Sequence, residues 1–311
     1  MDAEDGSAPA QKTMDFAVRS AGQGARIVQL SAHIMEGPPA KPEFLHAGLC
    51  QVGLPRSPTT ATTFERKSGK ASLLLEAGKL WDGVREEWVQ QPLPYGTRPR
   101  LALVHVSSEA IRTRNPGVEV GASAREFLLK LGIDTGGKEY KTFSAQMRAL
   151  AACHMSLGFG ADTLSAKPIK RFSTWMGSLD SSAELSPGVI ELSPEFFESL
   201  LEKAVPLDPR ALAALKQSAL ALDVYAWLAH RLHRVRPASG TFLTWDNLSE
   251  QFGQEYSDRR SFRKEFGAVL KRVMAVYPTG RINQTRAGIV LLPSPSPVPK
   301  TSVTVQRLIG A

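Results

Sequence analysis

The sequence predicts an α+β fold in which one arrangement of helices and strands occurs twice. The order helix, strand, helix, turn, helix and β-hairpin appears in two successive stretches. The third helix of each stretch has apolar residues at the same spacing, and basic residues concentrate in that helix and in the hairpin after it. A helix-turn-helix followed by a hairpin wing has this order. We therefore expect two tandem winged-helix domains, with the third helix of each as the recognition helix.

The first winged-helix domain is expected over residues 51–205, with roles in dimerisation and DNA binding. Ser123 is a typical helix cap, and the glycines between Gly132 and Gly137 end one helix before the next. The expected elements are helices at 99–112, 123–131, 138–157 and 194–203, a strand at 118–120, and wing arms at 169–175 and 189–192. A further hairpin over residues 64–75, with a basic turn at Lys67 and Lys70, precedes them.

The second winged-helix domain, residues 206–292, repeats this order and is also expected to bind DNA. Its expected elements are helices at 209–234, 246–252 and 257–276, a strand at 241–245, and wing arms at 280–282 and 288–292. The two recognition helices share the apolar spacing i, i+4, i+7, i+11, which is read from Phe143, Met147, Leu150 and His154 in the first and Phe262, Phe266, Val269 and Val273 in the second.

Two terminal segments lie outside these domains. Residues 1–50 are rich in Gly, Pro, Ala, Ser and Gln with little periodicity, so we expect a flexible leader with little packed structure. Residues 293–311 form a Pro-rich tail, in which prolines alternate with other residues from Pro293 to Pro299. Such a segment forms neither helix nor central strand and is expected to be extended.

Charge is distributed unevenly along the chain. Its 38 Lys and Arg against 30 Asp and Glu give a net charge of +8, which indicates a polyanionic partner. Residues 136–176 hold six basic and two acidic side chains, and residues 258–286 hold eight and two, whereas residues 177–257 hold six and eleven. The positive charge therefore lies in the expected recognition helices and wings, which favours double-stranded DNA. An RNA-binding protein is less favoured because no RNA-binding signature occurs.

The candidate DNA-binding residues are the basic side chains of these two helices and wings, together with one threonine. On the face opposite the apolar stripe, small residues such as Ala145 and Gly267 permit close approach to base edges. The basic residues on that face are Lys141 and Arg148 in the first helix and Arg260, Lys264 and Lys271 in the second. The candidates are Lys138, Lys141, Thr142, Arg148, Lys167, Lys170, Arg171, Arg260, Arg263, Lys264, Lys271, Arg281 and Arg286.

Enzymatic chemistry is not indicated. The segment Gly132–Lys138 approaches a phosphate-binding loop, but Glu139 stands where a Ser or Thr is needed and the loop joins two helices. Neither the two cysteines nor the pair His230 and His233 has the neighbours of a metal site. The histidines and tyrosines lack the arrangement of a rolling-circle nickase. We expect no catalytic residue, cofactor or metal.

The two cysteines, Cys50 and Cys153, are too few for a disulfide framework, which favours the reducing cytoplasm. Trp81, Trp88, Trp175, Trp227 and Trp245 are expected mainly in the core. No apolar stretch is long enough to span a membrane, and the acidic start Met1–Asp5 differs from a signal peptide.

Several segments resemble the RepA-type initiators of plasmid replication, in the same order along the chain. The resemblance spans about residues 50–298 and rests on Leu93–Gly96, Pro99–Val104, Glu109–Arg112, Gly132–Ile133, Thr135–Gly137, Ala221–Leu232, Val276–Pro278 and Gly288–Pro295. It implies a protein that binds repeated DNA sites at an origin, promotes duplex opening and recruits host helicase or initiator proteins. It also implies a monomer–dimer equilibrium, autorepression and a part in plasmid copy control.

The residues alone support tandem winged-helix DNA binding and leave an alternative open. A plasmid or phage transcriptional repressor without initiator activity would have the same charge pattern and element order.

Overall fold

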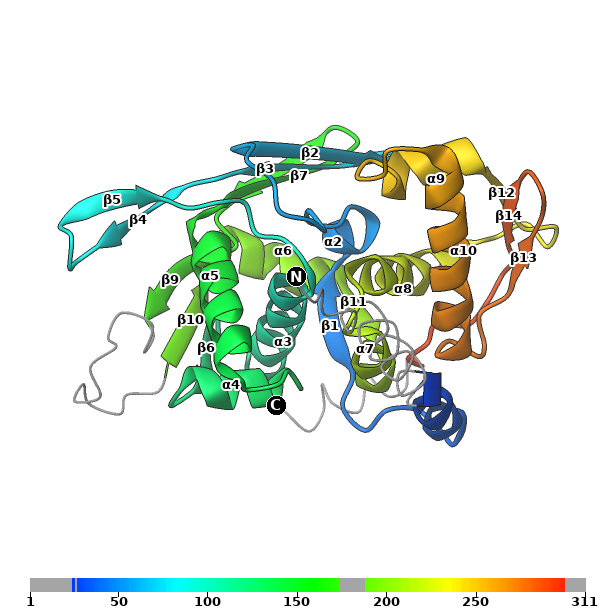
Figure 1. Ribbon diagram of the computed structural model, residues 1–311. Helices are drawn as coiled ribbons and strands as arrows, with labels where there is room; N and C mark the ends of the chain where they lie inside the picture. The colour runs from blue at the N-terminus through cyan, green and yellow to red at the C-terminus, as the bar shows by residue number, and fades with distance from the viewer. Residues whose placement is uncertain (1–23, 26, 174–187, 300–311) are drawn as a thin grey trace, which may run out of the picture.

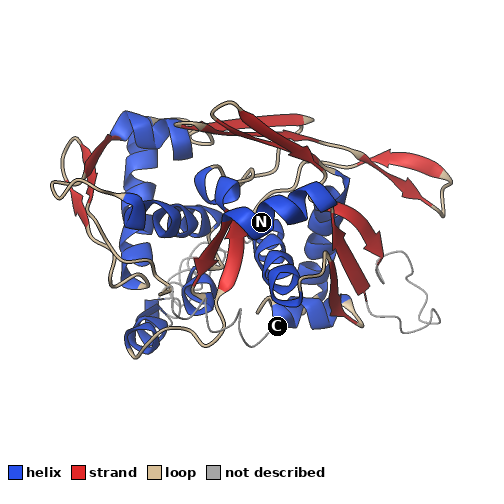
Figure 2. Cartoon of the chain, turned by 180° about the vertical axis from the view of Figure 1, so that it is seen from behind, coloured by secondary structure: helices blue, strands red, loops and turns tan. Residues whose placement is uncertain are grey.

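The computed structural model describes residues 24–25, 27–173 and 188–299. The fold is α+β, and its sheets are antiparallel. Two groups of helices, each with a small sheet, lie toward opposite ends of the molecule (Figures 1 and 2). We call the two groups the first and second units.

The first unit contains the predicted order of elements. Its elements are α3 (Thr97–Thr113), β6 (Gly117–Gly121), α4 (Ala124–Lys130), α5 (Gly137–Ala152), β9 (Ile169–Ser173) and β10 (Gly188–Leu192), and α6 (Pro194–Lys203) follows. Two strands that were not predicted, β7 (His154–Phe159) and β8 (Asp162–Ala166), lie between α5 and β9 in the chain and join a different sheet. Ser123 caps α4 as predicted, because its Oγ accepts a hydrogen bond from the backbone N–H of Glu126 at 3.2 Å. The three strands pair in the order β6-β10-β9, so the strand after α3 pairs with the second arm of the hairpin.

The second unit has a similar order of elements, but no strand intervenes between its last helix and its hairpin. It runs through α8 (Ala219–Arg231), the 3₁₀ turn η1 (Leu232–Arg234), β12 (Thr241–Thr244), α9 (Trp245–Phe252), α10 (Arg259–Ala275), β13 (Ile282–Gln284) and β14 (Gly288–Leu291). The strand order β12-β14-β13 matches that of the first unit. The duplication of element order predicted from the sequence is therefore present in the structure.

The remaining strands form three further sheets. The predicted hairpin at 64–75 is β2 (Thr63–Ser68) and β3 (Ala71–Glu76), which continue into a sheet of order β2-β3-β7-β8 with β7 (His154–Phe159) and β8 (Asp162–Ala166). Strands β4 (Lys79–Asp82) and β5 (Glu87–Gln90) form a separate hairpin that projects from the body (Figure 1). Strand β1 (Glu43–His46) pairs with β11 (Ala204–Leu207) at the centre of the molecule.

The prediction of a leader without packed structure is wrong for its last part. Strand β1 and helix α2 (Ala47–Gln51) lie in the core, where His46, Leu49 and Cys50 are buried. Residues 27–35 are helical, and the Ser31 hydroxyl donates to the carbonyl of Ala275 at the end of α10. These contacts are with residues more than 150 positions away, so local composition does not reveal them. The earlier part of the predicted leader, residues 1–23, lies outside the described residues.

Two predicted helices have different bounds. Helix α5 ends at Ala152, and residues predicted as its last turns form β7, which pairs with β3. His154 is therefore an exposed strand residue and not part of the helical stripe. The helix predicted at 209–234 is divided into α7 (Pro209–Leu215), α8 and η1, because Ser218 caps a new helix by accepting from the N–H of Ala221.

The predicted domain boundaries cross continuous structure. Strand β11 spans the boundary at residues 205 and 206, and buried apolar residues of both units belong to one hydrophobic cluster. The first part of the Pro-rich tail has no helix or strand, as expected, and lies against the body. Val298 is buried, and the Tyr277 hydroxyl donates to the Pro295 carbonyl at 2.6 Å. Residues 300–311 lie outside the described residues.

Candidate nucleic-acid interface

Helix α10 has one buried apolar side and one exposed basic side. The predicted stripe Phe262, Phe266, Val269 and Val273 is at most 1% exposed, and Asp258 caps the helix by accepting from the Ser261 N–H at 2.8 Å. Because a helix turns 100° per residue, packing of this stripe directs the intervening positions to solvent. The exposed basic residues are Arg259, Arg260, Arg263, Lys264 and Lys271.

The basic residues of α10 differ in whether their side chains contact another side chain of the protein. Arg259 forms an ion pair with Asp246 of α9 at 2.7 Å, and the guanidinium of Arg263 lies 5.3 Å from the ring centroid of Trp245. Lys264 and Lys271 form no ion pair with any acidic side chain in the described part of the chain. These two ammonium groups are therefore available to an external anion. Sequence reasoning missed Arg259, although it directly precedes Arg260 in the same basic run.

Helix α5 has the same two-sided character with fewer charges. Phe143, Met147 and Leu150 are buried, whereas Lys138, Lys141 and Arg148 are exposed. Thr142 is half-buried, and its hydroxyl donates to the Lys138 carbonyl at 2.9 Å. Thr142 can therefore still accept a hydrogen bond, but its donor is already used by the helix. The exposed face of α5 thus presents cations to solvent next to small residues such as Ala145.

The candidate residues of the hairpins differ in whether their side chains already have partners. Lys167, Lys170 and Arg171 are exposed at the start of the first hairpin, and Lys170 pairs with Glu191 of β10 at 3.1 Å. Residues 174–187, which include the predicted arm residue Trp175, lie outside the described residues.

In the second wing, Arg281 is held by the Pro-rich segment. Its Nε donates to the Pro293 carbonyl at 3.1 Å, and its backbone N–H donates to the Ser294 hydroxyl at 2.9 Å. Arg286 is exposed in the turn between β13 and β14.

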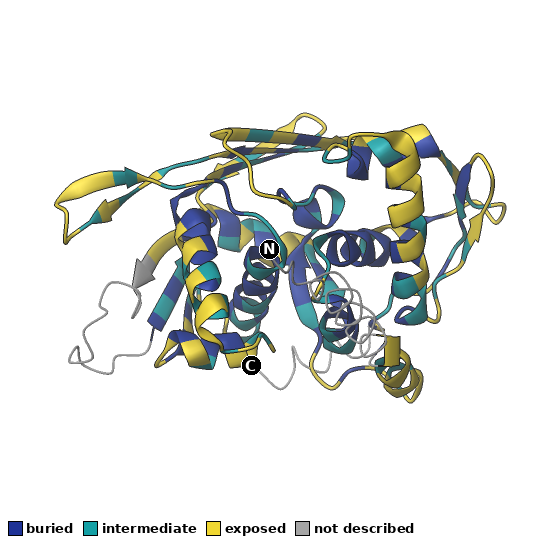
Figure 3. Cartoon of the chain, viewed as in Figure 1, coloured by how far each residue is buried: buried dark blue, intermediate teal, exposed yellow. Residues whose placement is uncertain are grey.

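The structure brings the candidates together as two separate basic surfaces. One consists of α5 and the β9–β10 hairpin, and the other of α10 and the β13–β14 hairpin, at opposite ends of the molecule (Figure 1). In the view of Figure 3, both helices show exposed residues on the side toward the viewer. In the second unit the β13–β14 hairpin flanks the basic face of α10, since a Cβ placed on Gly267 would lie 3.6 Å from the Gln284 side-chain nitrogen of β13.

The tryptophans do not all belong to the core. Trp227 and Trp245 are buried as expected, but Trp81 and Trp88 are 54% and 64% exposed on the projecting β4–β5 hairpin. They are directly opposite each other in the register, and their rings pack edge to face at 5.7 Å. This cross-strand pair stabilises a hairpin that has little core of its own.

Among the described residues, no group of three or more His, Cys, Asp or Glu side chains is placed to hold a metal ion. No helix in the described ranges combines the length and apolar character needed to cross a bilayer. Cys50 and Cys153 are both free and buried.

Comparison of the sequence with models of known protein families shows the family of this chain. The model of the family described as plasmid-encoded RepA protein matches residues 93–247. The chain belongs to this RepA family. The matched RepA region begins just before α3 and ends within α9, so it contains the whole first unit, whereas α10 and the second wing lie beyond it.

Similarity to solved structures is low in sequence identity. Two crystal structures of domains 2 and 3 of RctB are similar at 12% sequence identity and a TM-score of 0.49. One comparison covers 78% of this chain and 95% of the other, and the second covers 85% and 100%. No curated protein sequence matches the chain.

Proposed function

We propose that this RepA-family chain initiates plasmid replication by binding repeated double-stranded DNA sites at the origin. In this proposal the two units act as winged helices, α5 and α10 enter the major groove, and the β9–β10 and β13–β14 hairpins contact flanking phosphates. The protein itself supplies binding without catalysis or a cofactor, and it acts in the cytoplasm.

The observation that carries the proposal is that one strand order occurs twice, each time beside a helix with an exposed basic face. The strand orders β6-β10-β9 and β12-β14-β13 set a helix against a hairpin in the same way, and each helix buries its apolar stripe and exposes Lys and Arg. A protein that neutralises several phosphates gains affinity from the release of bound counterions. Membership of the plasmid-encoded RepA family supports a role in plasmid replication for the proposed DNA-binding surfaces.

The first experiment measures binding of the full chain to duplexes from its plasmid origin and to random duplexes of equal length. The double variant Lys264→Ala, Lys271→Ala removes two exposed cations of α10. We expect weaker binding to both DNAs and a flatter dependence on salt, by about 0.9 in log–log slope for each phosphate that is no longer neutralised. Lys41→Ala is the matched control, since Lys41 is exposed and lies ahead of β1, far along the chain from both basic helices. Equal binding by all three proteins would remove α10 from the interface.

Family resemblance also motivates the later steps. We propose that the bound protein promotes local duplex opening, recruits host helicase or initiator proteins, and represses its own gene in a monomer–dimer equilibrium that controls copy number. An inverted repeat suits a dimer, because a two-fold assembly presents the same recognition helix twice.

The second candidate function is transcriptional repression without initiation, which the same two basic surfaces would support. Transfer of the gene and its adjacent repeats to a vector without an origin separates the two. Autonomous maintenance of the vector supports the initiator, and repression without maintenance supports the repressor.

A further inference from the structure

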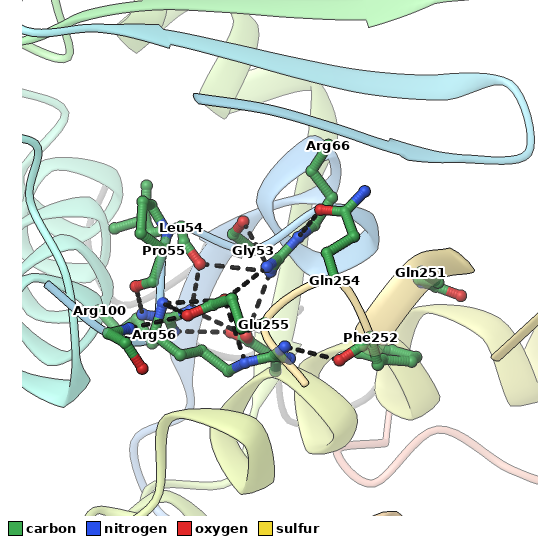
Figure 4. A network of polar contacts seen from close by, with 12 residues as sticks. Gly53, Leu54, Pro55, Arg56, Arg66, Arg100, Gln251, Phe252, Gln254 and Glu255 are labelled. Carbon is green, nitrogen blue, oxygen red and sulfur yellow. Dashed lines mark hydrogen bonds and ion pairs between the residues drawn. The ribbon is translucent and has the colours of Figure 1, made fainter. Parts of the chain in front are cut away.

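Five charged side chains form a buried network between the two units (Figure 4). Arg56 precedes β2, Arg66 is on β2, Arg100 is on α3, Asp223 is on α8, and Glu255 follows α9. We call this set the arginine cluster. Arg66 is 1% exposed, Arg100 and Asp223 are 8% exposed, and the Glu255 side chain is 18% exposed. Charged groups in such places require paired partners to offset their lost hydration.

The strongest link of the arginine cluster joins α3 of the first unit to α8 of the second. Arg100 donates to both carboxylate oxygens of Asp223, from Nε at 2.7 Å and from Nη2 at 2.8 Å. A bidentate pair of this kind fixes direction as well as distance. The backbone passes close by at Gly53, where a Cβ would lie 2.6 Å from the Asp223 carboxyl, so only glycine fits without displacement.

A second link joins β2 to the turn between α9 and α10. Arg66 donates from Nη2 to Glu255 Oε1 at 2.7 Å and from Nε to the Gln254 side chain at 3.3 Å. Glu255 also accepts from the backbone N–H groups of Arg56 and Ser57, at 2.9 and 2.8 Å. The turn that leads into α10 is therefore tied to the β2–β3–β7–β8 sheet, whose strand β7 follows α5 directly.

The same arginines also donate hydrogen bonds to backbone carbonyls of the segment 53–55, which lies between the units. Arg66 Nη1 donates to the carbonyls of Gly53 and Leu54, and Arg100 donates to those of Leu54 and Pro55. Each arginine thus has an acidic partner on the second unit and carbonyl partners in a shared segment. An apolar contact of equal area would permit sliding, whereas this network has one satisfied geometry.

We propose that the arginine cluster is a positioning device that fixes the orientation of α10 relative to α5, and so sets the spacing of DNA bases that one chain reads. A buried ion pair is weak support for stability but can specify a geometry, because every alternative arrangement leaves a charge unpaired. The effect on base spacing rests on the proposed DNA-binding function. The fixed orientation of α10 relative to α5 does not.

The first test measures orientation without DNA. Spin labels are placed at Ala145→Cys on α5 and Ala268→Cys on α10, which are exposed positions, whereas the native Cys50 and Cys153 are buried. Pulsed electron paramagnetic resonance then gives the distribution of distances between the labels. We expect one narrow distribution, and a width about twofold greater or more in Glu255→Ala, because the turn before α10 loses its tie to β2. Glu250→Ala, an exposed residue on α9 with the same charge change, should keep the parent width.

A folded Glu255→Ala protein with the parent distribution would overturn the proposal. Asp223→Asn provides a second variant that keeps side-chain shape and removes the charge, and Glu255→Gln replaces Glu255→Ala if the latter does not fold. Near-ultraviolet circular dichroism reports whether each protein is folded.

The second test measures spacing on DNA. A site is selected from a library of randomised duplexes with the full chain, and base pairs are then inserted at its centre. Insertion of about five base pairs, half a helical turn, should weaken wild-type binding about tenfold or more and Glu255→Ala about threefold or less. A general loss of stability lowers binding to all spacings alike and does not change this ratio. An equal insertion penalty in the two proteins contradicts the positioning role, whereas failure of the wild type to select any site contradicts the proposed function and leaves the label distances to decide the inference.

Discussion

The guanidinium of Arg263 lies 5.3 Å from the ring centroid of Trp245, and the indole Nε1 of Trp245 donates to the Arg286 carbonyl at 3.1 Å. Trp245 therefore connects three elements of the second unit: it begins α9, supports a basic residue of α10 and holds the turn of the β13–β14 hairpin. It also packs edge to face against Phe266 of α10. Trp245 therefore links the turn of the β13–β14 hairpin to α10.

Trp245→Phe keeps an aromatic ring but loses the hydrogen bond and weakens the cation–π contact. We expect the free energy of unfolding to fall by about 1–2 kcal/mol, measured by urea denaturation. Trp81→Phe, on the exposed face of the projecting hairpin, is the matched control and should cost less. A greater destabilisation by the control would show that the β4–β5 hairpin, and not the Trp245 contacts, limits stability.

The first wing should contribute phosphate contacts of unequal weight. Lys170 is paired with Glu191, so its release to DNA costs an ion pair, whereas Arg171 forms no ion pair with an acidic side chain among the described residues. Arg171→Ala should flatten the log–log salt dependence of binding by about 0.9, and Lys170→Ala by less. The ratio of specific to random binding should change little in either variant, because phosphate contacts carry no sequence information. A large fall in that ratio would place Arg171 against a base.

The two basic surfaces present different side chains, so under the proposed function one chain should protect an asymmetric DNA site. If α5 and α10 occupy successive major grooves on one side of the duplex, their centres lie about 10 to 10.5 base pairs apart and the footprint covers roughly 20 base pairs. Hydroxyl-radical footprinting at limiting protein measures this length. Protection of only about 10 base pairs by a monomer would mean that one unit does not touch DNA, and the less basic α5 surface would then be assigned to dimerisation.

Burial makes the stability depend on pH through His46. Desolvation, aided by the nearby Lys203, lowers the pKa of His46 from 6.5 to about 4. The folded protein contains the neutral ring, because Nδ1 must be unprotonated to accept a hydrogen bond from the Gly48 N–H at 3.0 Å. Nε2 lies 3.0 Å from the Ser199 hydroxyl. Since the unfolded chain binds this proton more readily, the stabilisation is complete above pH 6.5 and is lost as the pH falls toward 4, by about 3 kcal/mol at most.

The His46 contribution is isolated by comparing slopes. Urea denaturation between about pH 7 and 4.5 should show a steeper loss of stability for the wild type than for His46→Asn, in which Asn retains the ability to cap α2. Parallel curves would mean that His46 does not titrate differently on unfolding. His230, whose burial also lowers its pKa to about 4, remains in both proteins and cancels in the comparison.

The two native thiols should be unreactive in the folded protein. Burial raises the pKa of Cys153 to about 12 and raises that of Cys50 further, so thiolate is scarce at neutral pH. A thiol reagent such as dithionitrobenzoate should therefore react only at the rate of unfolding, and the rate should rise with urea in step with the loss of structure. Fast reaction of either cysteine in native buffer would contradict the packing of α2 or of the end of α5.

Local sequence determined the repeated order of elements and the two-sided helices. The stripe from Phe262 to Val273 and the Ser123 cap follow from neighbours within a few positions, because helix periodicity and capping are local effects. The same periodicity predicts the exposed positions of Lys264 and Lys141. The family resemblance read from short motifs is likewise confirmed over residues 93–247.

Only the tertiary structure decided what distant residues do. Residues 154–157 continue an apolar helical pattern in sequence, yet they form β7 because β3 offers a ladder of backbone partners. Strand β1 is ordered by β11, which lies far later in the chain. The arginine cluster is the clearest case: Arg66 and Arg100 resemble ordinary solvated cations in the sequence, but packing buries them against Glu255 and Asp223 of the second unit. Pairing across the fold follows from which surfaces exclude water together, and a linear pattern does not contain that information.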